Sequence, residues 1–159
     1  MLQIKIIAVG KLKEKYLLAA QAEYLKRLKP YAKVEIRETP DLPCPERYSP
    51  AQEEQVIKAE GEMILRHIQE HDYLIALDRN GKQLDSLEFA GLLREREVLS
   101  APLTLVIGGS MGLTAEVLQK ADLRLSFSKL TFPHQLFRVI LLEQIYRACK
   151  INRGEKYHK

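Results

Sequence analysis

The stretch "SKLTFPHQLFR", Ser128 to Arg138, joins a segment of no clear period to the start of a long helix. Pro133 suits the first position of a helix, because a backbone N–H at that position would lack a helical partner in any case. His134 and Arg138 then follow one turn apart, beside strongly apolar residues. A helix that only had to be buried would not need these two side chains. The stretch therefore predicts a functional junction between a loop and the last helix.

The last helix is apolar on most of its circumference. At 100° per residue, His134 and Arg138 lie near one direction, whereas Glu143, Arg147 and Lys150 lie near the opposite one. Such a helix is expected to be buried by more than its own sheet, and a second copy of the chain would supply the missing cover. Glu143 and Arg147, four residues apart, form either a simple helix salt bridge or a pair that holds a site's geometry near the dimer seam. The apolar residues between these two directions on the helix are Leu136, Phe137, Val139, Ile140, Leu141, Leu142 and Ile145.

The rest of the chain alternates strand-like and helix-like segments. The predicted strands are 2–10, 33–39, 73–77, 103–109 and 123–127, and the predicted helices are 14–29, 50–71, 85–99, 114–120 and the segment after Pro133. Ser49 with Gln52, and Asp85 with Glu88, have the spacing of helix-capping pairs, and "DRNGK" (78–82) is predicted to be a loop. The strands are almost continuously apolar, which favours an α/β fold with a mainly parallel sheet covered by helices on both faces.

Length and composition predict one globular domain, 1–159, since 46% of the residues are hydrophobic and 29% are charged. Cys44 and Cys149 are far apart and have no metal-ligand spacing, so free thiols in a reducing compartment are favoured over a disulfide, and no metal site is expected. The sequence shows neither a signal peptide nor a segment of transmembrane length. We therefore expect a cytoplasmic protein that does not bind a membrane.

Charge is unevenly distributed along the chain. The formal net charge is +4, but residues 124–159 carry +6 and residues 1–123 carry −2. In the terminal "INRGEKYHK", basic residues surround Tyr157 and His158. This basic end indicates either a solvated, frayed tail or a surface for RNA, with cations on phosphates and a base stacked on the aromatic ring. The basic residues of the tail are Arg153, Lys156 and Lys159.

Three strand ends are candidates for a ligand site, because ligands of parallel sheets bind beyond the carboxyl ends of the strands. They are Leu77–Asp78, Gly108–Gly112 and Phe127–Phe132. The glycines of "IGGSMG" either let the backbone approach a ligand or simply form a tight turn, and they lack the lysine of a P-loop. The segment "SFSKLTFPH" either wraps an amphipathic ligand or is an ordinary connection.

Several motifs together resemble a known family. "AVGKLKEKY", "ALDRNGK", "VIGGSMGL", "LSFSKLTFPHQLFRVILLEQIYRA" and "RGEKYHK" are similar to the RlmH-type members of the SPOUT methyltransferases. These bacterial enzymes methylate N3 of a pseudouridine in large-subunit ribosomal RNA. The resemblance runs from the first strand to the last residue, and no motif residue is missing, although Lys159 is elsewhere an arginine.

The resemblance implies a SPOUT fold with a deep C-terminal trefoil knot, although composition and pattern alone predict an unknotted sheet, since true knots are nearly absent from proteins. It also implies an obligate homodimer, S-adenosylmethionine (SAM) as the methyl donor, and a substrate in the ribosome or its large subunit rather than DNA. The expected cofactor-binding residues are Leu77, Gly108, Gly109, Phe127, Ser128, Lys129, Leu130, Thr131 and Phe132.

The N3–H of a uracil-type base is a weak acid, so methylation needs a base or a cation that stabilises the developing anion. A histidine titrates near pH 6.5 in model peptides, so His134, or His158 of the second copy, is a candidate base. Arg138 or Arg147 is a candidate anion stabiliser. The full set of predicted catalytic residues is His134, Arg138, Glu143, Arg147, Tyr157 and His158.

Two other functions fit the same residues. A related SPOUT enzyme would methylate a ribose or a guanine of tRNA. A non-enzymatic ribosome-associated factor would use the glycine segment only as a turn and the basic tail only to bind RNA. The identity of the modified nucleoside distinguishes a tRNA methyltransferase from the favoured function. Binding of SAM distinguishes an enzyme from a factor that only binds RNA.

Overall fold

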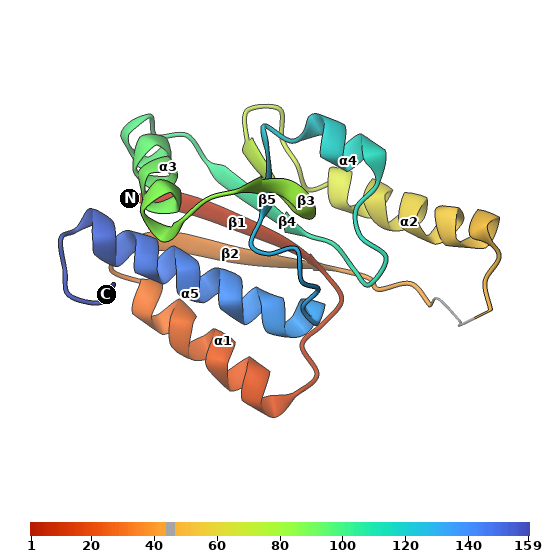
Figure 1. Ribbon diagram of the computed structural model, residues 1–159, viewed down its shortest axis with the longest axis horizontal. Helices are drawn as coiled ribbons and strands as arrows, with labels where there is room; N and C mark the ends of the chain where they lie inside the picture. The colour runs from red at the N-terminus through yellow and green to blue at the C-terminus, as the bar shows by residue number, and fades with distance from the viewer. Residues whose placement is uncertain (44–46) are drawn as a thin grey trace.

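The computed structural model describes residues 1–43 and 47–159, which alternate strands and helices (Figure 1). The elements are β1 (Leu2–Val9), α1 (Lys15–Leu28), β2 (Ala32–Thr39), α2 (Pro50–Leu65), β3 (Tyr73–Gln83), α3 (Ser86–Val98), β4 (Leu103–Ile107), α4 (Ala115–Lys120), β5 (Leu123–Ser126) and α5 (His134–Asn152). The expectation of a free thiol at Cys44 lies outside the described residues. Cys149 is a buried free thiol, and burial raises its pKa to about 11.

The strands form a single sheet in the order β2-β1-β4-β3-β5, and every pairing is parallel. Helices α1, α3 and α5 cover one face of the sheet, and α2 and α4 cover the other (Figure 1). Successive side chains of β1 enter different cores: Ile6 packs with α5 and α3, whereas Ile7 packs with α2 and α4. Burial on both faces explains why the strands are continuously apolar. The predicted α/β class, with a parallel sheet covered by helices on both faces, is confirmed.

The predicted helix caps are present. The Ser49 hydroxyl accepts a hydrogen bond from the backbone N–H of Gln52, and the Gln52 side chain accepts one from the backbone N–H of Ser49. Asp85 and Glu88 form the same reciprocal pair at the start of α3. Each pair satisfies two backbone N–H groups that the first helical turn leaves unpaired. These two helix starts could therefore be predicted from sequence alone.

Two sequence-based boundaries were wrong. Helix α2 ends at Leu65 rather than near residue 71, because Lys5 of β1 donates to the His67 carbonyl and to the Asp72 carboxylate, which fixes residues 66–72 in a turn. The predicted loop 78–82 belongs to β3, which continues to Gln83 after a shift of its register against β5. Gly81 permits this pairing, because a Cβ there would lie 2.5 Å from the Arg124 carbonyl oxygen.

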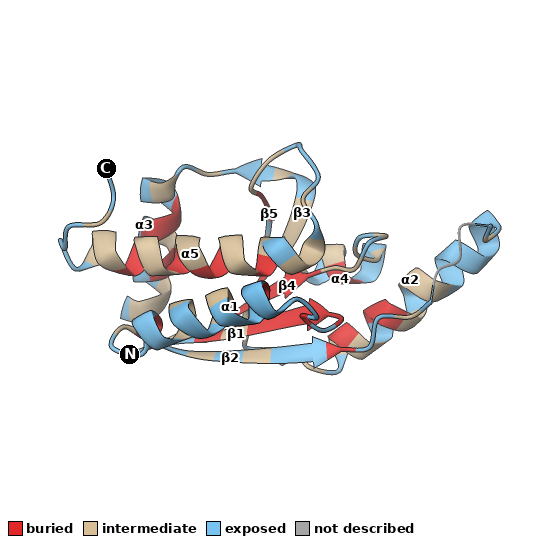
Figure 2. Ribbon diagram, turned by 90° about the horizontal axis from the view of Figure 1, so that it is seen from below, coloured by how far each residue is buried: buried red, intermediate tan, exposed pale blue. Residues whose placement is uncertain are grey.

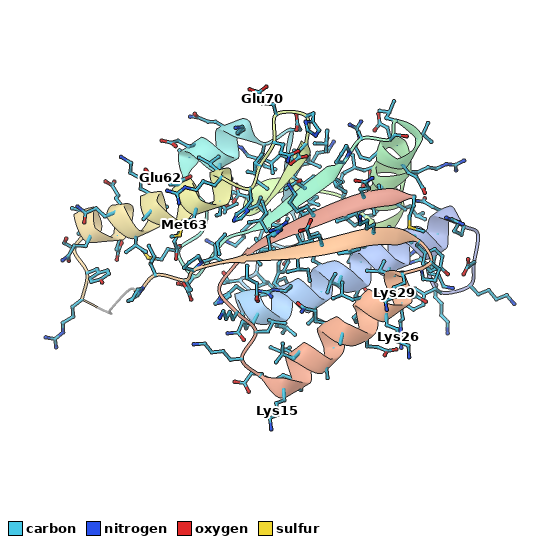
Figure 3. The ribbon with its side chains drawn as sticks, turned by 180° about the vertical axis from the view of Figure 1, so that it is seen from behind. Lys15, Lys26, Lys29, Glu62, Met63 and Glu70 are labelled. Carbon is cyan, nitrogen blue, oxygen red and sulfur yellow. The ribbon has the colours of Figure 1, made fainter. Side chains whose placement is uncertain are left out.

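Helix α5 lies between α1 and α3, which supply much of the cover that the sequence analysis assigned to a second copy (Figure 2). Its inner face, including Leu141 and Ile145, is fully buried, whereas Leu136 on its outer side remains 40% exposed. The outer face of α1 is mixed: Figure 3 shows Lys15 and Lys26 pointing away from the sheet, but Tyr16 and Leu18 are also 70% and 45% exposed. Both of these neighbouring helices therefore leave apolar side chains exposed to solvent.

Candidate functional site

A cavity of about 500 Å³ lies where β3, β4 and β5 bring their carboxyl-terminal segments together. All three strand ends singled out in the sequence contribute to its wall. Its lining residues are Leu77, Asp78, Arg79, Asn80, Ile107, Gly108, Gly109, Ser110, Met111, Gly112, Leu113, Leu118, Leu125, Phe127, Ser128, Leu130, Thr131, Phe132, His134 and Phe137. Eight of the nine predicted cofactor-binding residues thus surround one space. Lys129 is the exception and lines a separate hollow of about 240 Å³.

The glycine segment forms a tight turn and a cavity wall at once. The Gly112 N–H donates to the Gly109 carbonyl oxygen over 3.1 Å, and Gly112 has a φ of +84°, which disfavours any residue with a Cβ. A Cβ on Gly108 would lie 3.0 Å from the carbonyl carbon of Gly112. The two alternatives that the sequence left open are therefore compatible, since the turn itself exposes backbone to the cavity.

The segment after β5 combines local hydrogen bonds with aromatic packing. The Ser126 hydroxyl donates to the Ser128 carbonyl oxygen, and the Ser128 hydroxyl accepts from the Leu130 N–H. Phe127 contacts Phe137 edge to face, with ring centroids 5.1 Å apart. These contacts fix a segment without regular secondary structure, so that it presents both apolar rings and polar backbone to the cavity.

Phe127 and Phe132, with Leu125, also line a second cavity of about 410 Å³ that lies toward α3 and α5. The two cavities therefore share an apolar wall. The second cavity reaches Ile140 and Gln144 on α5, and the Gln144 amide oxygen accepts a hydrogen bond from Ser86. None of the predicted catalytic residues lines this second space.

The predicted catalytic residues do not all share one environment. His134, the first residue of α5, lines the larger cavity. Arg138, one turn later, is 1% exposed and lies away from it. The Arg138 guanidinium donates to the Glu38 carboxylate over 2.7 Å and to the Gly10 carbonyl oxygen over 3.1 Å. It thereby ties α5 to the carboxyl ends of β1 and β2.

The other four predicted catalytic residues form one network on the distal half of α5 and the tail. Glu143 accepts hydrogen bonds from Arg147 over 2.6 Å and from the Tyr157 hydroxyl over 3.1 Å. Burial, and then the Glu143 charge, raise the pKa of Tyr157 to about 12, so this phenol stays protonated at neutral pH. Arg147 also approaches Nδ1 of His158 to 3.1 Å. Since a guanidinium has no acceptor, this Nδ1 accepts and the ring proton lies on Nε2.

Two kinds of residue around the site were not among the residues predicted from the sequence. Arg79 and Asn80 line the cavity because β3 continues past the strand end Leu77–Asp78, and their polar character directly after an apolar strand was an available signal. Glu60 of α2 is 4% exposed and faces the glycine segment: a Cβ on Gly109 would lie 3.3 Å from its Oε1. No pattern in the sequence distinguishes Glu60 from the other glutamates of α2.

Replacing Glu60 with glutamine is expected to raise stability at neutral pH. Burial, the main cause, and the nearby Asp41 raise the pKa of Glu60, whose Oε2 accepts from the Leu42 N–H over 3.1 Å. The contribution of Glu60 to the free energy of unfolding is then fully present below its unfolded-state pKa and is lost as pH rises through its folded-state pKa. Glutamine keeps an acceptor oxygen for Leu42 and carries no charge.

Thermal unfolding of both proteins between about pH 4 and pH 8 checks this expectation. The variant should have the higher melting temperature at the upper end of this pH range. The difference in melting temperature should become smaller toward the lower end. Glu62→Gln, at an exposed position two residues along α2, is the matched control and should show no such trend. A difference that does not vary with pH would contradict the assignment to Glu60.

Within the described residues, no group of three or more His, Cys, Asp or Glu side chains could hold a metal ion. Across the same ranges, no helix has both the length and the apolar character needed to cross a membrane.

Comparisons with known proteins agree with this architecture. Residues 2–158 match the family described as predicted SPOUT methyltransferase. The ribosomal RNA large subunit methyltransferase H of Carboxydothermus hydrogenoformans is 55% identical, over 99% of this chain and 100% of that protein. The protein of the same name from Moorella thermoacetica is 52% identical, over 100% of both chains.

Solved structures share the fold at low sequence identity. A structure from Bordetella pertussis superposes with a TM-score of 0.56 at 15% identity, covering 92% of this chain and 93% of that one. A structure from Legionella pneumophila, solved with the bound cofactor SAM, gives a TM-score of 0.50 at 15% identity, covering 92% of this chain and 66% of that one. From the match over nearly its whole length and from these close relatives, the chain belongs to the SPOUT methyltransferase family.

Proposed function

We propose that this protein is a SAM-dependent methyltransferase that methylates N3 of a pseudouridine in large-subunit ribosomal RNA. The observation that carries the proposal is the convergence of Leu77, the glycine segment and residues 127–132 on one cavity. The names of full-length relatives at 55% and 52% identity supply the substrate class.

The residues around the cavity fit SAM. The volume of the cavity, about 500 Å³, lies in the range of sites for ligands of the size of SAM. Apolar side chains such as Phe127 and Phe132 suit a purine ring, whereas the backbone of Gly108 and Gly109 offers hydrogen-bonding groups that no side chain covers. When bound, SAM supplies an electrophilic methyl group on a positively charged sulfur. The cofactor-binding residues proposed from the resemblance, Lys129 excepted, are those that line this cavity.

His134 is the proposed base. It is the predicted catalytic residue that lines the cavity, so its imidazole could accept the N3 proton as the nitrogen attacks. His158 is the second candidate, but its Nδ1 is engaged by Arg147 and its Nε2 carries the ring proton. His158 would first have to exchange this partner. Arg147 then remains the candidate that stabilises the anion, because Arg138 is buried away from the cavity and donates to Glu38 and Gly10.

The working unit proposed is a homodimer. In a single chain, the network of Glu143, Arg147, Tyr157 and His158 does not line the cavity that holds His134. A partner seated on the outer side of α5, where Leu136 is 40% exposed, would cover this apolar surface and could bring its own tail network to the cavity. The tail cations Arg153, Lys156 and Lys159 would then contact RNA phosphates.

Further features follow from the same proposal. We propose a single domain over 1–159 whose C-terminal segment forms the trefoil knot of the family, and a cytoplasmic location where ribosomes are assembled. The proposed substrate is the assembled ribosomal particle rather than free RNA or DNA. Docking on a preformed particle would supply orientation that so small a protein cannot obtain from a long RNA alone.

Incubation of unmodified ribosomal particles with the protein and methyl-labelled SAM tests the function. We expect about one labelled methyl group per large subunit, found by mass spectrometry on N3 of a pseudouridine, as transfer to a single nucleotide requires. Label in tRNA instead would favour the related tRNA enzymes. Calorimetry with SAM alone is the control, since a factor that only binds RNA would release no heat.

A further inference from the structure

The hollow that contains Lys129 lies beside the proposed SAM cavity and is chemically different from it. Its walls come from the β3 extension and from the segment after β5, and Arg79 lines both spaces. The hollow has a volume of about 240 Å³, and its lining residues are Arg79, Asn80, Gly81, Gln83 and Lys129. Two cations and two amides thus surround this space, and no carboxylate side chain from the described residues lines it.

These cations are available to a ligand. Arg79 and Lys129 are both exposed, and within residues 1–43 and 47–159 neither forms an ion pair with a carboxylate. The Asp78 carboxylate, which lines the larger cavity, accepts instead from the Asn80 N–H over 3.1 Å. The hollow is therefore a positively charged depression with additional hydrogen-bond donors.

A single hydrogen bond connects this hollow to the cavity wall. The Arg79 guanidinium donates to the Thr131 hydroxyl over 2.7 Å, which orients its planar fork at the boundary of the two spaces. A guanidinium held in this way is preorganised for the oxygens of a phosphate.

We propose that this hollow binds a backbone phosphate of the RNA, next to the nucleotide that enters the methylation site. The inference rests on the proposed function. The carboxylate of SAM is the competing anion, but SAM also carries an ammonium and a sulfonium and is cationic overall, so a second region of positive charge does not complement it. A polyanionic backbone does complement two unpaired cations.

The test compares Lys129→Gln with the wild-type protein in binding to large ribosomal subunits at several salt concentrations. Loss of one phosphate contact should weaken binding roughly three- to tenfold and lower the slope of log K against log salt by about 0.7 to 0.9. Lys129→Arg should restore most of the slope, because it keeps the charge. Lys33→Gln is the matched control, since Lys33 is an exposed lysine on β2, the opposite edge of the sheet.

Two outcomes would overturn the inference. An unchanged salt slope in Lys129→Gln would exclude a phosphate contact, and a weakened affinity for SAM, measured by calorimetry without RNA, would assign the hollow to the cofactor. Methyl incorporation by the wild-type protein is recorded in the same samples. Absence of that incorporation would refute the proposed function, whereas the comparison of salt slopes would still decide whether the hollow binds RNA.

Discussion

Replacement of His134 by glutamine is expected to lower turnover by about two to four orders of magnitude, the usual contribution of a positioned general base. His134 begins α5 and lines the cavity that brings together three strand ends. Glutamine has a similar size and can form hydrogen bonds, but it cannot take up the N3 proton. Binding of SAM should stay nearly unchanged, because the apolar rings and the glycine backbone remain in place. Single-turnover methylation and calorimetry measure the two effects separately.

The chain provides a matched control for this substitution. His71 is exposed and lies in the turn between α2 and β3, outside the cavity, so His71→Gln should retain full activity. His158→Gln measures the contribution of the tail. A His134→Gln protein that keeps a substantial rate, beside a His158→Gln protein that does not, would transfer the role of base to the tail histidine.

Replacement of Arg138 by methionine is expected to destabilise the fold by about 2–4 kcal/mol, and to lower the melting temperature by roughly 5–15 °C. Methionine keeps the apolar stem but removes the hydrogen bonds to the Glu38 carboxylate and the Gly10 carbonyl oxygen. The Arg138 side chain is only 2% exposed, whereas that of Glu38 is 37% exposed. Water can therefore reach Glu38 after the substitution, which moderates the loss. Urea unfolding measures the loss in the free energy of unfolding.

Arg37→Met is the control for burial. Arg37 pairs with Glu35 at 2.5 Å, but their side chains are 53% and 50% exposed, so removal of this pair should cost less than about 1 kcal/mol. If Arg138→Met unfolded at the same urea concentration as Arg37→Met but lost methyl transfer, the Arg138 side chain would act in catalysis instead of in the architecture of α5.

Local signals in the sequence account for much of the fold. The capping pairs at Ser49 and Asp85 set two helix starts, and the continuous apolar runs identified a parallel sheet with both faces covered. The strand ends also indicated where a cavity forms, since Gly108 and Phe127 both line it. These features depend on backbone hydrogen bonds and on hydrophobic periodicity, which neighbouring residues express directly.

Features that depend on residues distant in the chain could not be predicted from these local signals. The end of α2 is set by Lys5, and the continuation of β3 depends on the close approach of Gly81 to Arg124. Sequence spacing placed His134 and Arg138 on one side of a helix. It could not show that His134 would line a cavity, whereas a buried Arg138 would form an ion pair with Glu38.

By itself, the sequence determined the order of the elements, the parallel character of the sheet and the segments that surround the cavity, because each of these follows from local pattern and the short reach of backbone hydrogen bonds. The tertiary structure alone decided what each side chain does. It buried Arg138 against Glu38, turned Lys129 away from the cavity and gathered Glu143, Arg147 and Tyr157 at the far end of α5. The energies of burial and of charge pairing depend on groups a hundred or more residues away in the chain, so spacing along the sequence does not encode them.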